Sequence, residues 1–268
     1  MVGLISPTGK PKMLAAVHPN KGIELEYRRR LTALIDKMNA SLAYFLAAAY
    51  RANPPELAQD KSPAAELNDA FKKLARRWDQ RFRELAPTLA KWFATSAKDR
   101  SDGALHAALR KSGMTVRFQM TRPANDAYQA MISENVGLIR SIASEHLTDV
   151  QGLVMRSVSR GRDLGTLTKE LEARYGLTRK RAAFIARDQN NKASAVIQAV
   201  RQRELGITQA IWLHSSGGRV PRPSHVKAGR ERLVYDVTKG AFIDGAWIYP
   251  GELPNCRCVC RAVVRGLT

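Results

Sequence analysis

The chain has 268 residues, of which 44% are hydrophobic and 25% are charged, so it can build one large or two modest domains without disulfide bonds. Its formal net charge of +20 predicts attraction to polyanions or acidic proteins, with a merely solvated basic surface as the alternative. The lack of any run of ~18 apolar residues argues against a membrane protein. The N-terminus shows no pattern of a secretion signal.

The N-terminal part of the chain predicts a flexible arm followed by helices. Residues 1–22 are rich in Pro, Gly and Lys without periodicity, so we expect a flexible arm there. Region 23–124 is expected to be helical, with a first helix at about 24–51 and a second that begins at Ser62-Pro63. Pro87 is expected to start a separate helix, and residues 101–103 to interrupt it.

Residues 125–205 predict a second helical region. Asn125 or Asp126 is expected to cap a long helix that ends near residue 159. A short helix closed by Gly176 should follow, and then a last long helix to about residue 204. Four polar residues, 188–191, occupy every side of that last helix, which favours hydrogen bonds to another segment over exposure.

Two groups of cations in these helical regions are candidate contacts for nucleic acid or an acidic partner. A basic helix face can follow a phosphate backbone. The alternative is a solvated face without a partner. The residues concerned are Lys72, Lys73, Arg76, Arg77, Arg179, Lys180 and Arg181.

Residues 206–268 predict a compact β-rich module. Gly, Pro and Asp separate short apolar runs that are typical of strands. The runs lie at 211–213, 233–235, 246–249 and 258–264. The expected fold class is therefore α+β, a mostly α-helical body with a small β-rich C-terminal module.

All three cysteines and two of the five histidines lie in this module. On a straight strand Cys256, Cys258 and Cys260 point to one face, and a rise of ~3.3 Å per residue keeps three sulfurs too far apart for one ion. A bend before the strand would let Cys256 and Cys258 bind zinc with His225, and His214 or Cys260 would be the fourth ligand. The alternative is that no cofactor is bound, with buried thiols and a His225 that pins a loop.

Catalysis finds little support in these residues. His225, Asn255 and Asp244 lack the spacing of a metal nuclease, and nothing in the sequence orients a thiol against His225 as a base. Residues 216–218 lack the lysine and helix of a P-loop. The sequence thus predicts no enzyme, with a metal-dependent nuclease and a plain DNA-binding protein as alternatives.

Two motifs resemble those of a known family. Ile185-Ala186-Arg187, followed by four polar residues, resembles its mid-helix motif, and a discontinuous closing motif follows nearer the C-terminus. The closing segments are 221–225, 249–252 and 255–258. In order and spacing they resemble the phage Mu F-like minor head proteins, also called phage head morphogenesis proteins. The resemblance covers roughly residues 125–265.

The resemblance implies a structural protein of the virion. Such proteins occur in few copies in a tailed-phage head, near the portal vertex, and take part in head assembly in the host cytoplasm. The implied partners are the portal protein, capsid or scaffold proteins and packaged double-stranded DNA, but no membrane. The family has no established catalytic residues to transfer.

The motifs also indicate which residues should organise the C-terminal module. Arg187 and Asn191 are expected to tie the last helix to it by hydrogen bonds, and the two cysteines of Cys-Arg-Cys are expected to close it. Some relatives carry a histidine where this chain has Leu253-Pro254, which removes one potential ligand. The full set is Arg187, Asn191, Trp212, Arg222, His225, Pro250, Cys256, Arg257 and Cys258.

Overall fold

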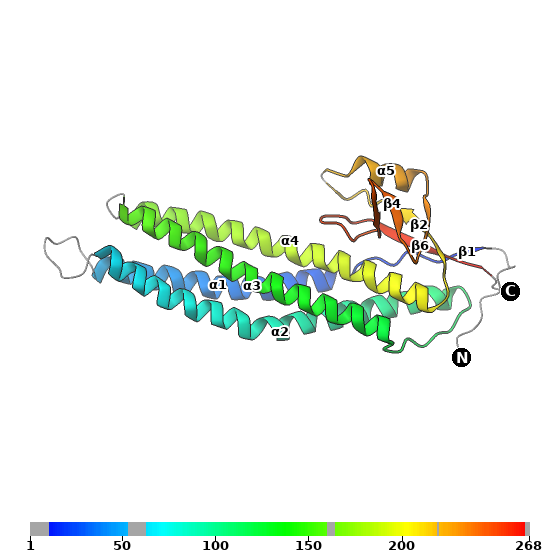
Figure 1. Ribbon diagram of the computed structural model, residues 1–268, viewed down its shortest axis with the longest axis horizontal. Helices are drawn as coiled ribbons and strands as arrows, with labels where there is room; N and C mark the ends of the chain where they lie inside the picture. Colours follow the sequence, from blue (N-terminus) through cyan, green and yellow to red (C-terminus); the bar gives the residue numbers. More distant parts are fainter. Residues whose placement is uncertain (1–10, 53–62, 160–163, 219, 266–268) are drawn as a thin grey trace. The chain divides into compact units, whose positions relative to one another are not determined.

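The computed structural model describes residues 11–52, 63–159, 164–218 and 220–265 (Figure 1). Long helices form most of the chain, and short strands with one short helix follow them. The elements are β1 Lys12–Met13, α1 Lys21–Ala52, α2 Pro63–Lys111, α3 Arg122–Ser159, α4 Leu164–Glu204, β2 Gln209–Leu213, α5 Pro223–Arg230, β3 Val234–Asp236, β4 Ala241–Ile243, β5 Ala246–Ile248 and β6 Val259–Val264. The predicted α+β class is confirmed.

The chain divides into two compact units, and each long helix contributes a segment to both. The helical unit comprises residues 26–90 and 134–185. The sheet unit comprises the described parts of residues 1–25, 91–133 and 186–268. The expected boundaries followed chain order, whereas these units combine distant segments because long helices pass from one unit into the other.

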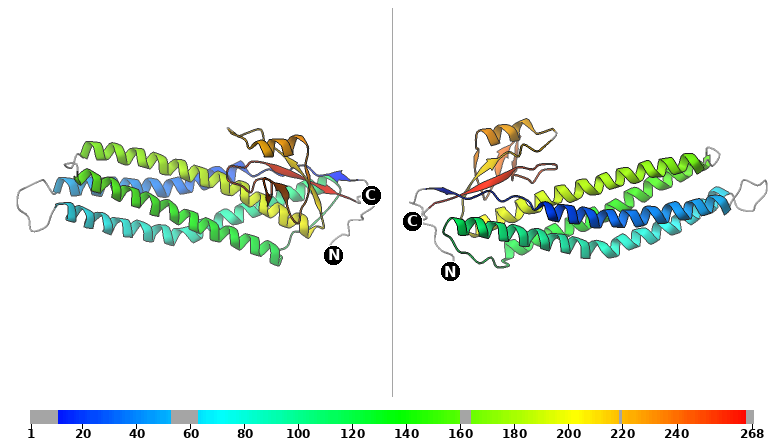
Figure 2. Two further views of the ribbon diagram at one scale, coloured as in Figure 1. Left: turned by 45° about the horizontal axis from the view of Figure 1, so that its top comes forward. Right: turned by 180° about the vertical axis from the view of Figure 1, so that it is seen from behind.

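In the helical unit, segments of α1 to α4 lie side by side (Figure 2). Leu31, Ile35 and Met38 of α1 are buried at helical spacing, as the apolar periodicity predicts. Polar contacts are also buried between the helices, since the Tyr27 hydroxyl donates to Asn135 Oδ1 at 2.9 Å. Such bonds satisfy groups that would otherwise be costly to bury.

α2 runs without a break through Pro87, so the predicted start of a separate helix there is wrong. Phe82, Ala86 and Leu89 remain buried on both sides of the proline, and the packing of this apolar face outweighs the low helix propensity of Pro87. Pro87 has no N–H to donate to the carbonyl oxygen one turn earlier. Because Pro87 is exposed, water can donate to that oxygen instead.

The predicted interruption of α2 at residues 101–103 is also wrong, because these polar residues serve tertiary contacts in the sheet unit. Both Asp102 oxygens accept hydrogen bonds of 2.8 Å from the guanidinium of Arg201 on α4. Arg201 is 2% exposed and also donates to the carbonyl oxygen of Gln119 at 2.7 Å. Loss of either partner would leave the other charge buried and uncompensated, so Asp102 and Arg201 depend on each other.

Two further helix boundaries differ from the prediction. α3 is capped by Thr121, whose hydroxyl accepts the Ala124 amide at 3.3 Å, rather than by Asn125 or Asp126. α4 continues through Gly176, where we expected a helix to end. Beyond that glycine Thr178 faces inward, since it donates to the Arg174 carbonyl at 3.1 Å and contacts His146 Nδ1 at 2.9 Å.

The sheet unit contains an antiparallel sheet with strand order β1-β6-β2-β3. β6 pairs with β2 from Gln209↔Val263 to Leu213↔Val259 (Figure 2). β1 pairs along the other edge of β6, and Leu14 just after it is buried. The expected flexible arm therefore takes part in the sheet over the residues described, while residues 1–10 lie outside the described part.

The sequence analysis did not predict α5 or β4. Asp244 and Gly245, with φ of 53° and 79°, form the two-residue turn that joins β4 to β5. Asp-Gly between two apolar runs is a strong hairpin signal, and it was overlooked. α5 begins at Pro223, a favoured first helical residue, and it buries His225 and Ala228.

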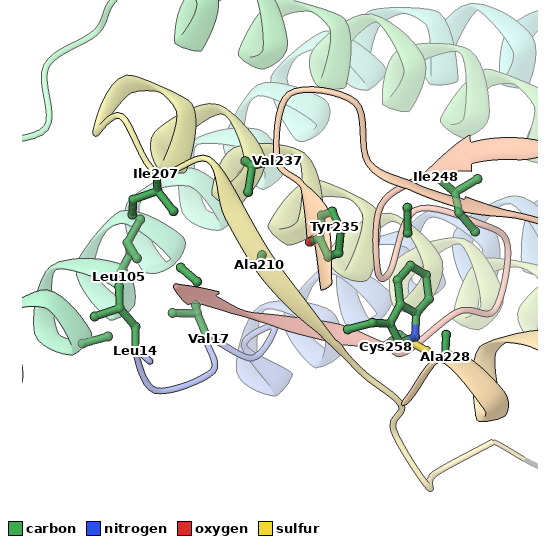
Figure 3. Packing of buried hydrophobic residues seen from close by; sticks show 14 of the residues in the cluster. Leu14, Val17, Leu105, Ile207, Ala210, Ala228, Tyr235, Val237, Ile248 and Cys258 are labelled. Carbon is green, nitrogen blue, oxygen red and sulfur yellow. The ribbon is translucent and has the colours of Figure 1, made fainter. Parts of the chain in front are cut away.

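One hydrophobic cluster holds the sheet unit together (Figure 3). Leu105 of α2, Val17 before α1 and Cys258 before β6 all belong to it, so residues distant in sequence share one core. Trp212 of β2 is fully buried there. Over the residues described, no helix combines the length and apolar character that crossing a lipid bilayer requires.

We expect His146 to make the helical unit sensitive to acid. Burial, and then the charge of Arg174, lowers the pKa of His146 from 6.5 to about 4. The unfolded chain therefore takes up a proton below pH 6.5, whereas the folded chain resists protonation until about pH 4. The contribution of neutral His146 to the free energy of unfolding is complete above pH 6.5, and it falls by roughly 3 kcal/mol as the pH drops to 4.

Urea unfolding of the wild type and of His146→Gln at several pH values checks this expectation. The wild type should lose more stability between pH 6.5 and 4 than the variant does. His18→Gln, a change of an exposed histidine, is the matched control and should keep the wild-type slope. Equal slopes for all three proteins would contradict the assignment.

Candidate functional site

The polar residues in the middle of α4 contact the segment that precedes β6. Asn191 Nδ2 donates to the carbonyl oxygen of Cys256 at 3.0 Å. The Asn255 amide donates to Asp188 Oδ1 at 2.6 Å, and Arg187 Nη2 donates to Asn255 Oδ1 at 3.1 Å. These residues therefore bond to another segment, the outcome that their position on every side of the helix favoured.

The same helix also holds the start of the described chain. Asn190 Nδ2 donates to the carbonyl oxygen of Asn20 at 3.1 Å, and Gln198 Nε2 donates to that of Val17, also at 3.1 Å. Asn190 and Gln198 are 2% and 5% exposed, so these carbonyls supply the partners that buried amides need. Side-chain amides of α4 thus donate hydrogen bonds both to the N-terminal segment and to the closing motif.

A tight turn over residues 249–256 bends the chain before β6. Glu252 accepts the Tyr249 amide at 2.8 Å, and Asn255 has a φ of 61°, a left-handed conformation that asparagine tolerates well. Gly251, with a φ of 93°, lies so close to α4 that a Cβ atom would be 3.4 Å from the Asn191 carbonyl oxygen. The turn therefore needs glycine at this position.

The bend brings Cys256 and Cys258 against His225 of α5. His225 Nδ1 lies 3.4 Å from Cys256 Sγ and 3.8 Å from Cys258 Sγ. The three ligand atoms all lie within 4.8 Å of one another, and the residues are only 2–5% exposed. Neither His214 nor Cys260, the candidate fourth ligands, belongs to this group; Cys260 Sγ instead accepts Gln202 Nε2 at 3.5 Å.

The pKa values of the two thiols in this cluster shift in opposite directions. The hydrogen bond from Cys258 lowers the pKa of the Cys256 thiol to about 5, and the amides of Cys258 and Gly251 also stabilise the thiolate. The same hydrogen bond, together with burial, raises the pKa of Cys258. Of the two thiols, Cys256 is therefore the more acidic.

The remaining motif residues support this cluster or the loops around it. The Trp212 ring lies at 79° to the His225 ring, with 5.0 Å between centroids. Arg222 Nη2 donates to the Pro254 carbonyl at 3.0 Å, and Arg257 Nη1 donates to the Gly217 carbonyl at 2.6 Å. Pro250 is buried beside the turn. Both arginines therefore hold backbone carbonyls rather than facing one common ligand.

The residues that hold α5 in place were not predicted from the sequence. Gly229 lies against β2, where a Cβ atom would be 2.3 Å from the Cβ of His214, so a larger residue does not fit. Ser224 donates to Asp244 Oδ2 at 2.6 Å, which joins α5 to the β4–β5 hairpin. The proline at 223 signalled a helix start, but no pattern in the sequence identified Gly229 as a close contact.

The two candidate basic groups both lie in the helical unit. Lys72, Lys73, Arg76 and Arg77 are exposed on α2. On α4, Arg181 pairs with Glu145 at 2.7 Å and Arg179 lies 3.9 Å from Asp36, while Lys180 is exposed. Acidic neighbours therefore offset part of the α4 charge. The residues of the α2 group therefore remain the stronger candidates for contact with a polyanion.

We expect Asn191→Ala to destabilise the sheet unit, because it leaves the Cys256 carbonyl without its side-chain donor at a buried contact. A buried polar group that loses its partner costs about 1–3 kcal/mol. Urea unfolding measures the change. Asn125→Ala, an exposed asparagine of α3, is the matched control and should change stability by less than about 0.5 kcal/mol. Equal effects of both variants would contradict the role of Asn191.

Comparison with known proteins gives two matches. Residues 148–261 match the family described as Phage Mu protein F like protein. An uncharacterized protein of Haemophilus influenzae is 36% identical over 169 residues, which make up 62% of this chain and 34% of that relative. The chain thus spans about a third of the length of the curated relative that it matches. No solved structure matches it.

The family match includes the polar segment of α4, helix α5 and the closing turn, which are the parts that contact one another in the sheet unit. It confirms the resemblance that the two motifs indicated. Over residues 148–261 the chain is similar to the Phage Mu protein F like family.

Proposed function

We propose that the protein is a minor head protein of a tailed phage or prophage that acts in head morphogenesis. The observation that carries the proposal is the family match over residues 148–261, which includes both motifs and the contact between them. The protein is made as a late protein in the host cytoplasm and becomes part of the virion, with capsid or scaffold proteins among its partners. Its position there is the portal vertex.

The helical unit offers surfaces suited to a protein partner. The exposed residues of α1 include Tyr44 and Phe45, whose rings lie edge to face with centroids 5.2 Å apart. Exposed aromatic side chains contribute strongly to protein interfaces. Contact with a helical ring such as the portal uses this kind of surface.

The charge of the chain supports a further contact with packaged DNA. The net charge is +20, and the α2 cations at residues 72, 73, 76 and 77 are exposed. These side chains are spaced to follow a phosphate backbone, where each neutralised phosphate releases counterions. Such binding is independent of sequence, which suits a protein that meets any packaged genome.

The described structure favours this role over a nuclease. Among the residues described, the group of close His, Cys, Asp or Glu ligands is His225, Cys256 and Cys258, each at most 5% exposed. A phosphodiester must reach the metal and its activated water during hydrolysis. Burial of this group argues against access of DNA, so we assign the site no catalytic role.

We expect the chain to co-purify with proheads and with the portal protein. A version of the phage or prophage that lacks the chain should give fewer mature, DNA-filled heads. Affinity purification of portal protein from infected or induced cells, followed by mass spectrometry, checks the contact, with the major tail protein as the control for nonspecific recovery. Absence of the chain from purified proheads and virions would contradict the proposal.

DNA binding should depend steeply on salt and on the α2 cations. Replacing Lys72, Lys73, Arg76 and Arg77 with Gln should flatten the slope of log affinity against log salt by as much as about 3 to 4, at ~0.9 per phosphate contact. Arg29→Gln with Arg30→Gln is the control, because both arginines already pair with Glu26 at 2.7 Å.

The same assay separates the alternatives. An unchanged slope in the α2 variant would mean that this surface does not contact DNA. Cleavage of plasmid by the wild type in magnesium, manganese or zinc, lost in His225→Ala, would favour the nuclease. Salt-dependent DNA binding without recovery from proheads would favour a plain DNA-binding protein.

A further inference from the structure

The cluster of His225, Cys256 and Cys258 has the dimensions of a tetrahedral metal site. A zinc ion bonded to sulfur at ~2.3 Å and to nitrogen at ~2.0–2.1 Å sets its ligands about 3.5–3.8 Å apart. His225 Nδ1 lies 3.4 Å and 3.8 Å from the two sulfurs. We propose that these three residues bind one zinc ion, with Nδ1 and both Sγ atoms as ligands.

The surroundings of the sulfurs suit thiolates. The backbone amides of Gly251 and Ser215 favour the thiolate forms of Cys256 and Cys258, respectively. The Trp212 indole N–H also interacts weakly with the Cys258 sulfur, and it has no other hydrogen-bond partner among the residues described. Donors of this kind stabilise metal-bound sulfur and orient it, as groups around metal ligands commonly do.

Burial supports a cation at this position. The residues are 2%, 4% and 5% exposed, so one thiolate here is a buried negative charge and two would be strongly unfavourable alone. Zinc makes the double thiolate stable, and its binding releases the thiol protons to solvent. The ion therefore offsets a charge that the surrounding amides can only partly balance.

The fourth position belongs to a water molecule. Among the described residues His214 and Cys260 lie outside the group, and Cys260 already accepts a hydrogen bond from Gln202. Three protein ligands and one water form the arrangement of catalytic zinc sites, whereas structural sites are usually closed by four protein ligands. Here the ligand residues are at most 5% exposed, which keeps a large substrate away from the water. In this buried setting the ion acts as a structural clamp.

The clamp connects three parts of the Mu F-like region. His225 belongs to α5, and the cysteines flank the end of the closing turn, whose Cys256 carbonyl is bound by Asn191 of α4. Zinc would therefore bond α5 to the closing turn, which Asn191 holds against α4. This inference stands apart from the proposed head function, because it concerns the isolated chain and does not require a portal or DNA.

Metal analysis of the tag-free full chain, refolded with zinc and dialysed, tests the proposal. We expect about one zinc ion per chain in the wild type and in Cys260→Ser, the matched control cysteine of the same module. Cys256→Ser, Cys258→Ser and His225→Gln should each hold far less. Circular dichroism checks that the variants keep their helices.

Cobalt provides a second measurement on the wild type, which decides the matter where a ligand variant fails to fold. Thiolate ligation gives cobalt(II) an intense near-ultraviolet charge-transfer band and tetrahedral visible bands. Both should form in the wild type and in Cys260→Ser, and zinc should displace the cobalt. A wild type with well under half an equivalent of zinc and no thiolate band, or ligand variants that bind as much metal as the wild type, would overturn the site.

Discussion

The closing turn of the sheet unit is held to α4 by the buried hydrogen bond from Asn191 to the carbonyl oxygen of Cys256. The same turn requires glycine at position 251, because its φ is 93° and a Cβ atom there would lie 3.1 Å from the Cys258 carbonyl oxygen. The bend in this turn directs both cysteines towards His225. Together with the bonds of Arg187 and Asp188 to Asn255, this amide positions the segment that enters β6.

Polar residues with partners on other segments occur inside α2 and α4, and two of them, Asp102 and Thr178, lie at or near expected helix ends. Asp102, Thr178 and Asn191 are residue types that favour turns and helix ends, because their side chains compete for backbone groups. In this fold each makes a long-range contact instead, to Arg201, His146 and Cys256 respectively. These tertiary bonds satisfy the polar side chains within the fold, so the helices continue through them, although Thr178 also donates to the Arg174 carbonyl of its own helix.

The local sequence pattern predicted several elements of the fold, whereas features that depend on contacts between distant residues were not predicted. Apolar periodicity predicted the helical body, and the strand geometry showed that two cysteines could share an ion with His225 only after a bend; the structure places that bend at Asn255. The pairing of β1 with β6 was not predictable in the same way, since two residues of strand carry no periodic signal. The close approach of Gly229 to His214 likewise depends on α5 folding back onto β2, which no local pattern encodes.

The division of the chain also separates two kinds of chemistry. The exposed α2 cations lie in the helical unit, whereas the buried Cys and His side chains and the motif contacts lie in the sheet unit. Family motifs that concern internal contacts, such as Asn191 to Cys256, preserve a fold and do not by themselves identify a partner. The cations and aromatic rings proposed for contact with a partner lie in the helical unit, whereas the contacts between the two family motifs lie within the sheet unit.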